Sequence, residues 1–135
     1  AVIWQESRFD PTVRGRAGEI GLMQLCAPAA REWADAEGLK MFVHESLFDP
    51  HKNILAGTWY LAKLQKRYPY ADDPVPYTLA DYNAGRANVL RWNQGAAATN
   101  SLLFLRQMTF PGTRQYIQNI RERRAIYQKE RWGQP

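Results

Sequence analysis

The chain has 135 residues, a hydrophobic fraction of 45% and a formal net charge of +5. This length suits one buried core, and five Trp, seven Tyr and five Phe exclude a disordered protein. No apolar run approaches the roughly 18 residues of a membrane-spanning helix. A single cysteine, Cys26, excludes an internal disulfide. The positive charge is typical of a solubilising surface or of a protein with an anionic partner, either an acidic polymer or nucleic acid.

Helical spacing and turn residues predict a mostly α-helical domain. Val2, Ile3, Glu6 and Phe9 would share one face of a first helix. Segment 10–21 holds three Gly and a Pro, which indicates a loop with at most a short hairpin. Proline, glycine and Asp-Pro signals then mark the ends of the later elements. We expect further helices over 28–37, 50–68, 77–83, 99–108 and 113–129.

No repeat, low-complexity tract or long linker divides the chain, so we expect a single domain over 1–135. The sequence has neither an initiator Met nor a signal peptide, and it begins within the first expected helix. It is therefore interpreted as a mature or excised domain, a fragment of a longer chain.

Glu6 is the residue that fits its surroundings least. The other three positions on its face of the first helix are apolar. A charge placed in a protein interior costs several kcal/mol unless it is paired or neutralised. The pattern alone favours a buried, paired glutamate, but an acid in an apolar pocket can also donate a proton near neutral pH. Glycoside cleavage requires such an acid for the leaving oxygen.

Other common sites are not supported. His44 and His51 lie seven residues apart across a helix boundary, and Cys26 has no companion at ligand spacing, so no metal site is expected. No nucleophile elbow, P-loop or dinucleotide fingerprint is present. RYPY (67–70) and NVLRW (88–92) do not form the aromatic platform of a single-strand binder, so no nucleic acid is expected as a partner.

Two further segments are unusual for a plain core. GEIGLMQL (18–25) places Gln24 within an apolar run, after glycines that would let a ligand approach the backbone. LADYNAG (79–85) places Tyr82 and Asn83 at a helix end, where their polar tips could point into a groove. Each of these residues taken singly is more often structural.

Taken together, five segments resemble the catalytic domain of soluble lytic transglycosylases, in the lysozyme-like superfamily and related to goose-type lysozyme. The resemblance lies in their order and spacing through nearly the whole chain. The segments are QESRFDP (5–11), GEIGLMQL (18–25), LFDPHKNILAGTWYL (47–61), LADYNAG (79–85) and TRQYIQNI (113–120).

The resemblance implies a mainly α, lysozyme-like, two-lobed fold with a groove for a glycan strand. The implied substrate is peptidoglycan, cut between N-acetylmuramic acid (MurNAc) and N-acetylglucosamine (GlcNAc). Glu6 matches the family's single catalytic glutamate, which would act as acid and then as base and leave 1,6-anhydroMurNAc ends. The substrate's acetamido group would replace a second carboxylate, and no cofactor is implied.

The resemblance also implies a set of substrate-binding positions. Tyr82 would orient Glu6, Gln24 would contact the sugars, and Leu22 and Met23 would line the groove. The full set of implied binding residues is Ser7, Leu22, Met23, Gln24, Tyr82, Asn83 and Tyr116.

Several positions depart from the family pattern. Gly15 stands where many relatives carry a Ser, and Cys26 stands where a Met often follows. Arg86 occupies a Pro position after YNAG, and FPGTR (110–114) replaces an acidic pattern. An acidic residue that some relatives hold near Arg106 is also missing. These changes leave Glu6 in place but alter candidate substrate contacts.

Two alternatives differ in chemistry. A water-using muramidase on the same fold would need a base, for which Asp10 or Glu19 is the nearby supply. A non-catalytic glycan-binding module would have no chemical reason to keep Glu6. The family substrate also implies an extracytoplasmic location. We further expect a monomer, and weak membrane or wall association through flanking regions.

Overall fold

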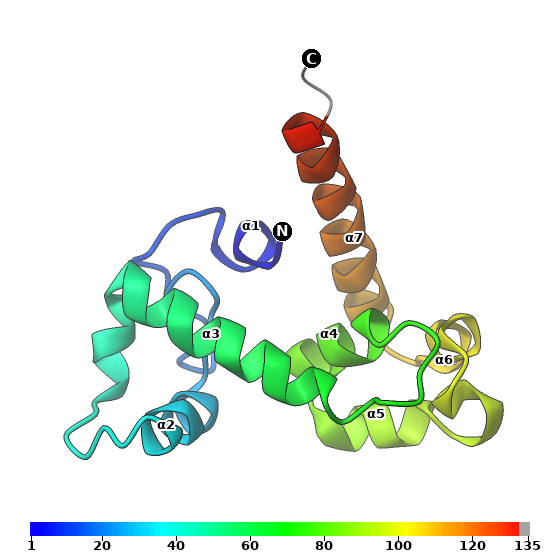
Figure 1. Cartoon of the computed structure of the whole chain (residues 1–135), viewed down its shortest axis with the longest axis horizontal. Coiled ribbons are helices and arrows are strands. Elements are labelled where there is room, and N and C mark those ends of the chain that lie inside the picture. The colour runs from blue at the N-terminus through cyan, green and yellow to red at the C-terminus, as the bar shows by residue number, and fades with distance from the viewer. Residues whose placement is uncertain (133–135) are drawn as a thin grey trace. The chain divides into compact units, whose positions relative to one another are not determined.

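The computed structural model describes residues 1–132, which form α-helices and short 3₁₀ helices (Figure 1). Within this range no strand is present, and two isolated antiparallel bridges, Arg14–Ile20 and Ile20–Leu25, take the place of a hairpin. The prediction of a mainly α fold is therefore confirmed. The elements are α1 (Val2–Ser7), α2 (Ala27–Ala36), η1 (His44–Phe48), α3 (Pro50–Gln65), α4 (Val75–Ala84), α5 (Arg86–Trp92), η2 (Gly95–Ala98), α6 (Ser101–Gln107) and α7 (Pro111–Trp132).

The first helix is shorter than its sequence pattern predicts. α1 ends at Ser7, and Arg8 and Phe9 adopt left-handed backbone angles, with φ of 54° and 65°. Phe9 is consequently 55% exposed, and its predicted place on the apolar face beside Glu6 is wrong. Helix α5 and both 3₁₀ helices were not predicted, because elements this short carry weak periodicity.

The chain forms two compact units, Ala1–Tyr60 and Leu61–Pro135. Helix α3 contributes residues to both units, since it runs from Pro50 to Gln65. This division does not test the prediction of one domain over 1–135, which stays a prediction. None of the helices within residues 1–132 is long and apolar enough to cross a bilayer.

The first unit is organised around Asn53, a fully buried residue of α3. Asp49 caps this helix as predicted, because its Oδ1 accepts a hydrogen bond from the Lys52 backbone N–H at 2.8 Å. One turn into the helix, Asn53 Oδ1 accepts from the Met23 backbone N–H at 2.8 Å. Asn53 Nδ2 donates to the carbonyls of Ile20, at 2.8 Å, and Leu47, at 2.9 Å. A single amide therefore joins three segments of the unit.

Two glycines allow this close approach. Gly21 has φ of 75°, and a Cβ there would collide with the Asn53 amide and lie 2.7 Å from the Leu47 carbonyl oxygen. Gly57, one turn after Asn53 on α3, leaves room for the Met23 side chain, which a Cβ would strike. The glycines thus let segment 18–25 lie directly against α3.

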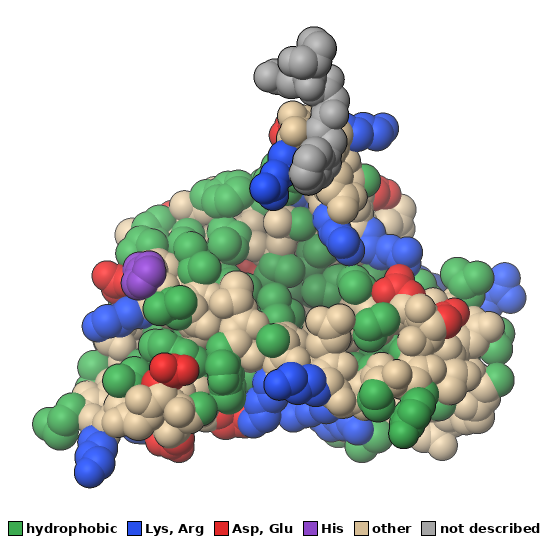
Figure 2. Space-filling view, viewed as in Figure 1, with side chains coloured by type: hydrophobic (Ala, Val, Ile, Leu, Met, Phe, Trp, Pro, Cys, Tyr) green, Lys and Arg blue, Asp and Glu red, His purple; other side chains and the backbone are tan. Residues whose placement is uncertain are grey.

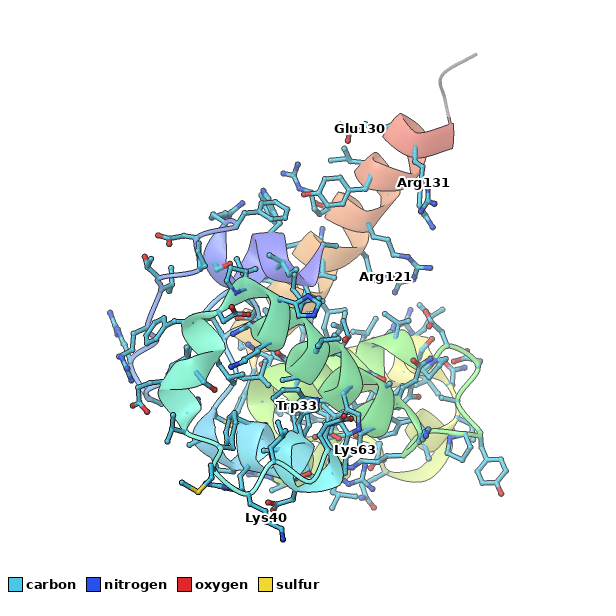
Figure 3. All side chains as sticks on the ribbon, turned by 60° about the vertical axis from the view of Figure 1, so that its left-hand side comes forward. Trp33, Lys40, Lys63, Arg121, Glu130 and Arg131 are labelled. Carbon is cyan, nitrogen blue, oxygen red and sulfur yellow. The ribbon has the colours of Figure 1, made fainter. Side chains whose placement is uncertain are left out.

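Helix α2 completes the first unit with an aromatic contact. Its buried Trp33 meets Phe42 edge to face, with ring centroids 6.0 Å apart. Arg31 adds a hydrogen bond to the Phe42 carbonyl at 3.3 Å. Phe42 therefore holds the connection that follows α2. Figure 3 shows Trp33 on α2 and the charged side chain of Lys40, in that connection, pointing away from the ribbon.

The core of the second unit is a stack of aromatic rings. Tyr77 of α4 lies between Tyr68 and Phe104, with centroid separations of 5.4 Å and 4.1 Å. Its hydroxyl donates to the Ala97 carbonyl at 2.6 Å. Burial, reinforced by the charges of Asp72 and Asp73, raises the pKa of Tyr77 to about 12.

Helix α7 begins in this core and ends at the surface. Thr113, Tyr116, Ile117 and Ile120 are buried, whereas no side chain from Arg121 to Arg131 is. Figure 2 shows Lys and Arg side chains gathered along this helix. The basic stretch 121–131 is therefore a solvated part of the helix, and Arg121 forms an ion pair with Asp73 at 3.6 Å.

Replacing Asn53 by Ala should lower the free energy of unfolding by about 3–5 kcal/mol, because three buried backbone groups would lose their partner. Urea denaturation measures this change. Lys52→Ala, at the exposed neighbouring position of α3, is the matched control and should stay within about 0.5 kcal/mol. A loss below about 1 kcal/mol for Asn53→Ala would contradict the central role of this amide.

Tyr77 should make the protein sensitive to alkali. Its folded pKa, about 12, lies above its ordinary value of 10.0, so its contribution is complete below pH 10 and is lost toward pH 12. Urea unfolding followed from about pH 9 to about pH 12 should show a shallower decline for Tyr77→Phe than for the wild type. Parallel declines would show that Tyr77 does not ionise on unfolding.

Candidate functional site

Glu6 occupies the last turn of α1 and is half-buried. The next residue, Ser7, anchors this helix: its Oγ lies 2.8 Å from the Leu22 carbonyl and 3.1 Å from the Ile3 carbonyl. The one hydroxyl hydrogen is the donor in both contacts and is shared between the two carbonyl oxygens. Because Ser7 ties α1 to segment 18–25, the position of Glu6 relative to that segment is set by its immediate neighbour.

The predicted binding residue Ser7 is itself 5% exposed. Its hydroxyl already serves backbone carbonyls of α1 and of segment 18–25. This placement favours a role in positioning Glu6 over direct contact with a sugar.

Gln24 lies near the end of segment 18–25, with a left-handed φ of 49°. Its Nε2 donates to the carbonyls of Val13, at 3.0 Å, and Gly21, at 2.8 Å, so both amide hydrogens hold the loop. Only Oε1 is left to meet a ligand, and it could do so only as an acceptor. The structure thus explains the polar residue within an apolar run: Gln24 closes the loop.

Leu22 and Met23, predicted to line a groove, are 8% and 2% exposed. Met23 packs over Gly57 and its backbone N–H binds Asn53. The side chains of these two residues are therefore packed inside the first unit.

The Glu19 side chain occupies the space next to the Cα atom of Gly15. A Cβ on Gly15 would collide with Glu19 Oε2 and lie 2.9 Å from Gln24 Oε1. Glu19 Oε2 also accepts from the Ala17 backbone N–H at 3.1 Å, and the Gly15 N–H donates to the Glu19 carbonyl at 2.8 Å. The carboxylate of Glu19 thus fills the position that a side chain on residue 15 would take. Sequence patterns gave no sign of this pairing.

The second unit holds the remaining predicted site residues. Tyr82, which is half-buried, and the exposed Asn83 lie in the last turn of α4, which ends where Gly85 takes φ of 85°. The buried Thr113 of α7 donates from Oγ1 to Asn83 Oδ1 at 2.8 Å. Asn83 therefore has Nδ2, a donor, as the group that a ligand could use.

Tyr116 lies on α7 one turn after Thr113 and is 5% exposed. Helices α4 and α7 pack against each other, so Tyr82, Asn83 and Tyr116 come from two contacting elements. Glu6, Ser7, Leu22, Met23 and Gln24 form the other group of candidates, in the first unit.

A polar network around the buried Asp81, the residue before Tyr82, was missed by sequence reasoning. Asp81 accepts two hydrogen bonds from Arg67 Nη1, at 2.9 Å and 3.1 Å, and one from the Tyr68 hydroxyl at 2.6 Å. Arg86 Nη1 in turn donates to the Tyr68 oxygen at 2.9 Å. The available sequence signal was an aspartate on the buried side of a helix, which demands partners but does not identify them.

The phenol at the centre of this network stays protonated. Burial and the adjacent Asp81 raise the pKa of Tyr68 far above its ordinary value, and Arg86 opposes them more weakly. A neutral Tyr68 can donate to Asp81 and accept from Arg86 at once.

No group of His, Cys, Asp and Glu within the described residues could hold a metal ion. His44 Nε2 lies 2.8 Å from the Leu25 carbonyl oxygen, and Cys26 is half-exposed at the start of α2.

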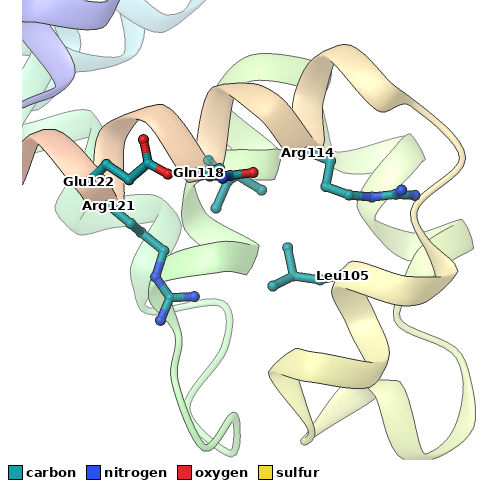
Figure 4. Close-up of a pocket in the computed structure, with 6 residues that line it drawn as sticks. Leu105, Arg114, Gln118, Arg121 and Glu122 are labelled. Atoms are coloured by element: carbon teal, nitrogen blue, oxygen red, sulfur yellow. Dashed lines mark hydrogen bonds between the residues drawn. The ribbon is translucent and has the colours of Figure 1, made fainter.

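A cavity lies apart from these candidates, between α6 and α7. It measures about 350 Å³, and Figure 4 shows Leu105 of α6 pointing toward α7, the helix that carries Gln118, Arg121 and Glu122. Gln118 Nε2 donates to Glu122 Oε1 at 2.9 Å along its edge. None of the predicted site residues lines it; its lining is Leu105, Arg114, Ile117, Gln118, Arg121 and Glu122.

Comparison with known proteins identifies the family. A family model described as "Transglycosylase SLT domain" matches residues 1–104. A membrane-bound lytic murein transglycosylase F of Desulfosudis oleivorans is 40% identical over 92 residues, covering 66% of this chain and 18% of the relative.

Two solved structures have the same fold. The 70 kDa soluble lytic transglycosylase of Escherichia coli matches with a TM-score of 0.75 and 28% identity, over 88% of this chain and 19% of that one. An inactive mutant of the lytic transglycosylase Slt from Pseudomonas aeruginosa, with Gln in place of a Glu, matches with a TM-score of 0.74, 28% identity and the same coverage.

The chain spans about a fifth of the length of these relatives. The family match itself covers residues 1–104, which include Glu6, segment 18–25 and the YNAG segment. Together with the lysozyme-like helical fold of the solved relatives, this match shows that the chain belongs to the transglycosylase SLT domain family.

Proposed function

We propose that this chain is the catalytic domain of a peptidoglycan lytic transglycosylase. It would cleave the MurNAc-β-1,4-GlcNAc bond and leave 1,6-anhydroMurNAc ends. The observation that carries the proposal is Glu6, an acid on α1 held next to segment 18–25 by the Ser7–Leu22 hydrogen bond. Membership of the SLT family and the names of the relatives support it. The inactive Glu-to-Gln mutant of Slt supports a glutamate as the essential group.

In this mechanism Glu6 acts twice. Its protonated carboxyl gives a proton to the glycosidic oxygen while the bond from that oxygen to the MurNAc anomeric carbon breaks. The resulting carboxylate then takes the proton of the MurNAc 6-hydroxyl, and the 6-oxygen forms a new bond to the anomeric carbon. Glu6 ends in its starting state, and no water is consumed.

The other candidates would support this chemistry in different ways. Gln24 would accept from a sugar through Oε1, and Asn83 would donate through Nδ2, since their remaining groups serve the protein. Tyr82 would contact the glycan from the last turn of α4. Leu22, Met23 and Tyr116 would act through packing, as their burial suggests.

A hydrolytic muramidase would need a second carboxylate as base. Asp10 is exposed and accepts from Thr12 through both N–H and hydroxyl, at 2.8 Å and 2.6 Å, which lowers the pKa of its carboxyl. Glu19 holds the Ala17 N–H and fills the space over Gly15. These contacts give both carboxylates structural roles and favour a single-acid mechanism.

The substrate also sets the place of action. Peptidoglycan lies outside the cytoplasmic membrane, so an extracytoplasmic enzyme that binds glycan strands is part of the proposal. We further propose that the domain acts as a monomer, with any weak membrane or wall association supplied by flanking regions.

Replacing Glu6 by Gln should abolish peptidoglycan cleavage, with a loss of at least about 100-fold in rate, because the amide cannot donate or accept the proton. Release of soluble fragments from purified peptidoglycan measures the rate, and an unchanged thermal unfolding curve confirms the fold. Gln5→Ala, at the preceding position, is the control. Activity retained by Glu6→Gln would contradict the proposal.

The products separate the two chemistries. Anhydro ends are lighter than hydrolytic ends by one water, about 18 Da, which mass spectrometry resolves. We expect anhydro ends from the wild type and from Glu19→Ala alike, because the proposed mechanism needs no second carboxylate. Hydrolytic ends from the wild type that disappear in Glu19→Ala would instead make Glu19 the base of a muramidase.

A further inference from the structure

Arg86 begins α5 directly after the YNAG segment, and its guanidinium is fixed in place. Its Nη1 donates to the Tyr68 hydroxyl oxygen at 2.9 Å, and its Cζ lies 5.3 Å from the centroid of the Tyr68 ring. Tyr68 is itself held by Asp81, which Arg67 binds through both carboxylate oxygens. The guanidinium therefore rests on three connected side chains, of which Tyr68 and Asp81 are buried and Arg67 is partly exposed.

The charge of Arg86 is not neutralised by these side chains. Asp81 forms its ion pair with Arg67, at 2.9 Å, and gives its third contact to the phenol. Arg86 meets only the neutral Tyr68 and has no ion pair among residues 1–132. Four of the five guanidinium N–H donors are left for solvent or a ligand.

The position of Arg86 places this charge near a candidate binding group. Asn83 lies three residues earlier, so the two Cα atoms are at most roughly 11 Å apart. Asn83 Oδ1 is occupied by Thr113, which leaves a donor there as well. This corner between α4 and α5 thus offers a neutral donor and a pre-oriented cation, a combination suited to a sugar that carries a carboxylate.

We infer that Arg86 is a specificity-determining residue that binds a carboxylate of the peptidoglycan strand at the α4–α5 corner. The inference rests on the proposed function and deepens it. Two carboxylate sources exist on such strands: the lactyl group of MurNAc where no peptide is attached, and the stem peptides, which occupy that lactyl group through an amide bond. Uncharged chitin oligosaccharides offer neither.

The test measures binding by calorimetry in the Glu6→Gln background, so that no ligand is cleaved. The ligands are stem-bearing glycan strands, strands stripped of their stems by an amidase, and a chitin oligosaccharide. Arg86→Met and Arg86→Pro both remove the charge, and proline is well tolerated at the first position of a helix. Arg91→Met removes an equal charge from an exposed position of the same helix and is the matched control.

We expect both Arg86 variants to weaken binding of at least one carboxylate-bearing strand roughly tenfold, less so at high salt, and to leave chitin binding unchanged. Arg86→Lys should show an intermediate loss, because lysine keeps the charge but not the planar fork. Loss on stem-bearing strands alone identifies the stem peptide, loss on stripped strands alone identifies the lactyl group, and loss on both assigns both. Arg91→Met should leave all three affinities unchanged.

Equal losses on all three ligands, or no loss on either carboxylate-bearing strand, would overturn the inference. Failure of the proposed function is seen separately, as absence of peptidoglycan cleavage by the protein with Glu6 intact. Wild-type cleavage combined with unaltered binding by the Arg86 variants would therefore remove the carboxylate site and leave the transglycosylase assignment standing.

Discussion

The three hydrogen bonds of Asn53 are the interaction on which the first unit depends. A buried amide gains stability only when its donor and acceptor groups are satisfied, and here they bind Met23, Ile20 and Leu47. These contacts bring segment 18–25 onto α3 without any strand pairing beyond isolated bridges. The hydrogen bond that anchors α1, from Ser7 to the Leu22 carbonyl, depends on this placement of segment 18–25.

The second unit uses the same principle with a charge. Asp81 is buried near the end of α4. The free-energy cost of removing its carboxylate from water is offset by hydrogen bonds from Arg67 and from the Tyr68 phenol. Removing any one partner would leave a polar group unsatisfied, so the corner that carries Tyr82 is held firmly. In both units, then, a buried polar residue fixes the backbone next to the candidate functional side chains.

Two departures from the family pattern acquire structural counterparts. Gly15 lacks a side chain, and the carboxylate of Glu19 fills that space. Arg86 replaces a proline, and Tyr68 supplies the acceptor that holds its guanidinium. Each change is thus accompanied by a contact from another residue, which indicates that the surroundings are adapted to it. The altered groups lie beside the Gly-rich loop and the YNAG segment, where differences in ligand preference would arise.

The sequence by itself determined the mainly helical class, the start of α3 at Asp49-Pro50, the end of α4 at Gly85, and the resemblance that singles out Glu6. These features depend on local signals, such as capping, backbone angles and spacing. Only the tertiary structure decided that Asn53 is a hub and that Arg86 rests on Tyr68. Their partners lie 6 to 33 residues away along the chain. The partners in such long-range hydrogen bonds are determined by tertiary packing. No periodic pattern in the sequence indicates them.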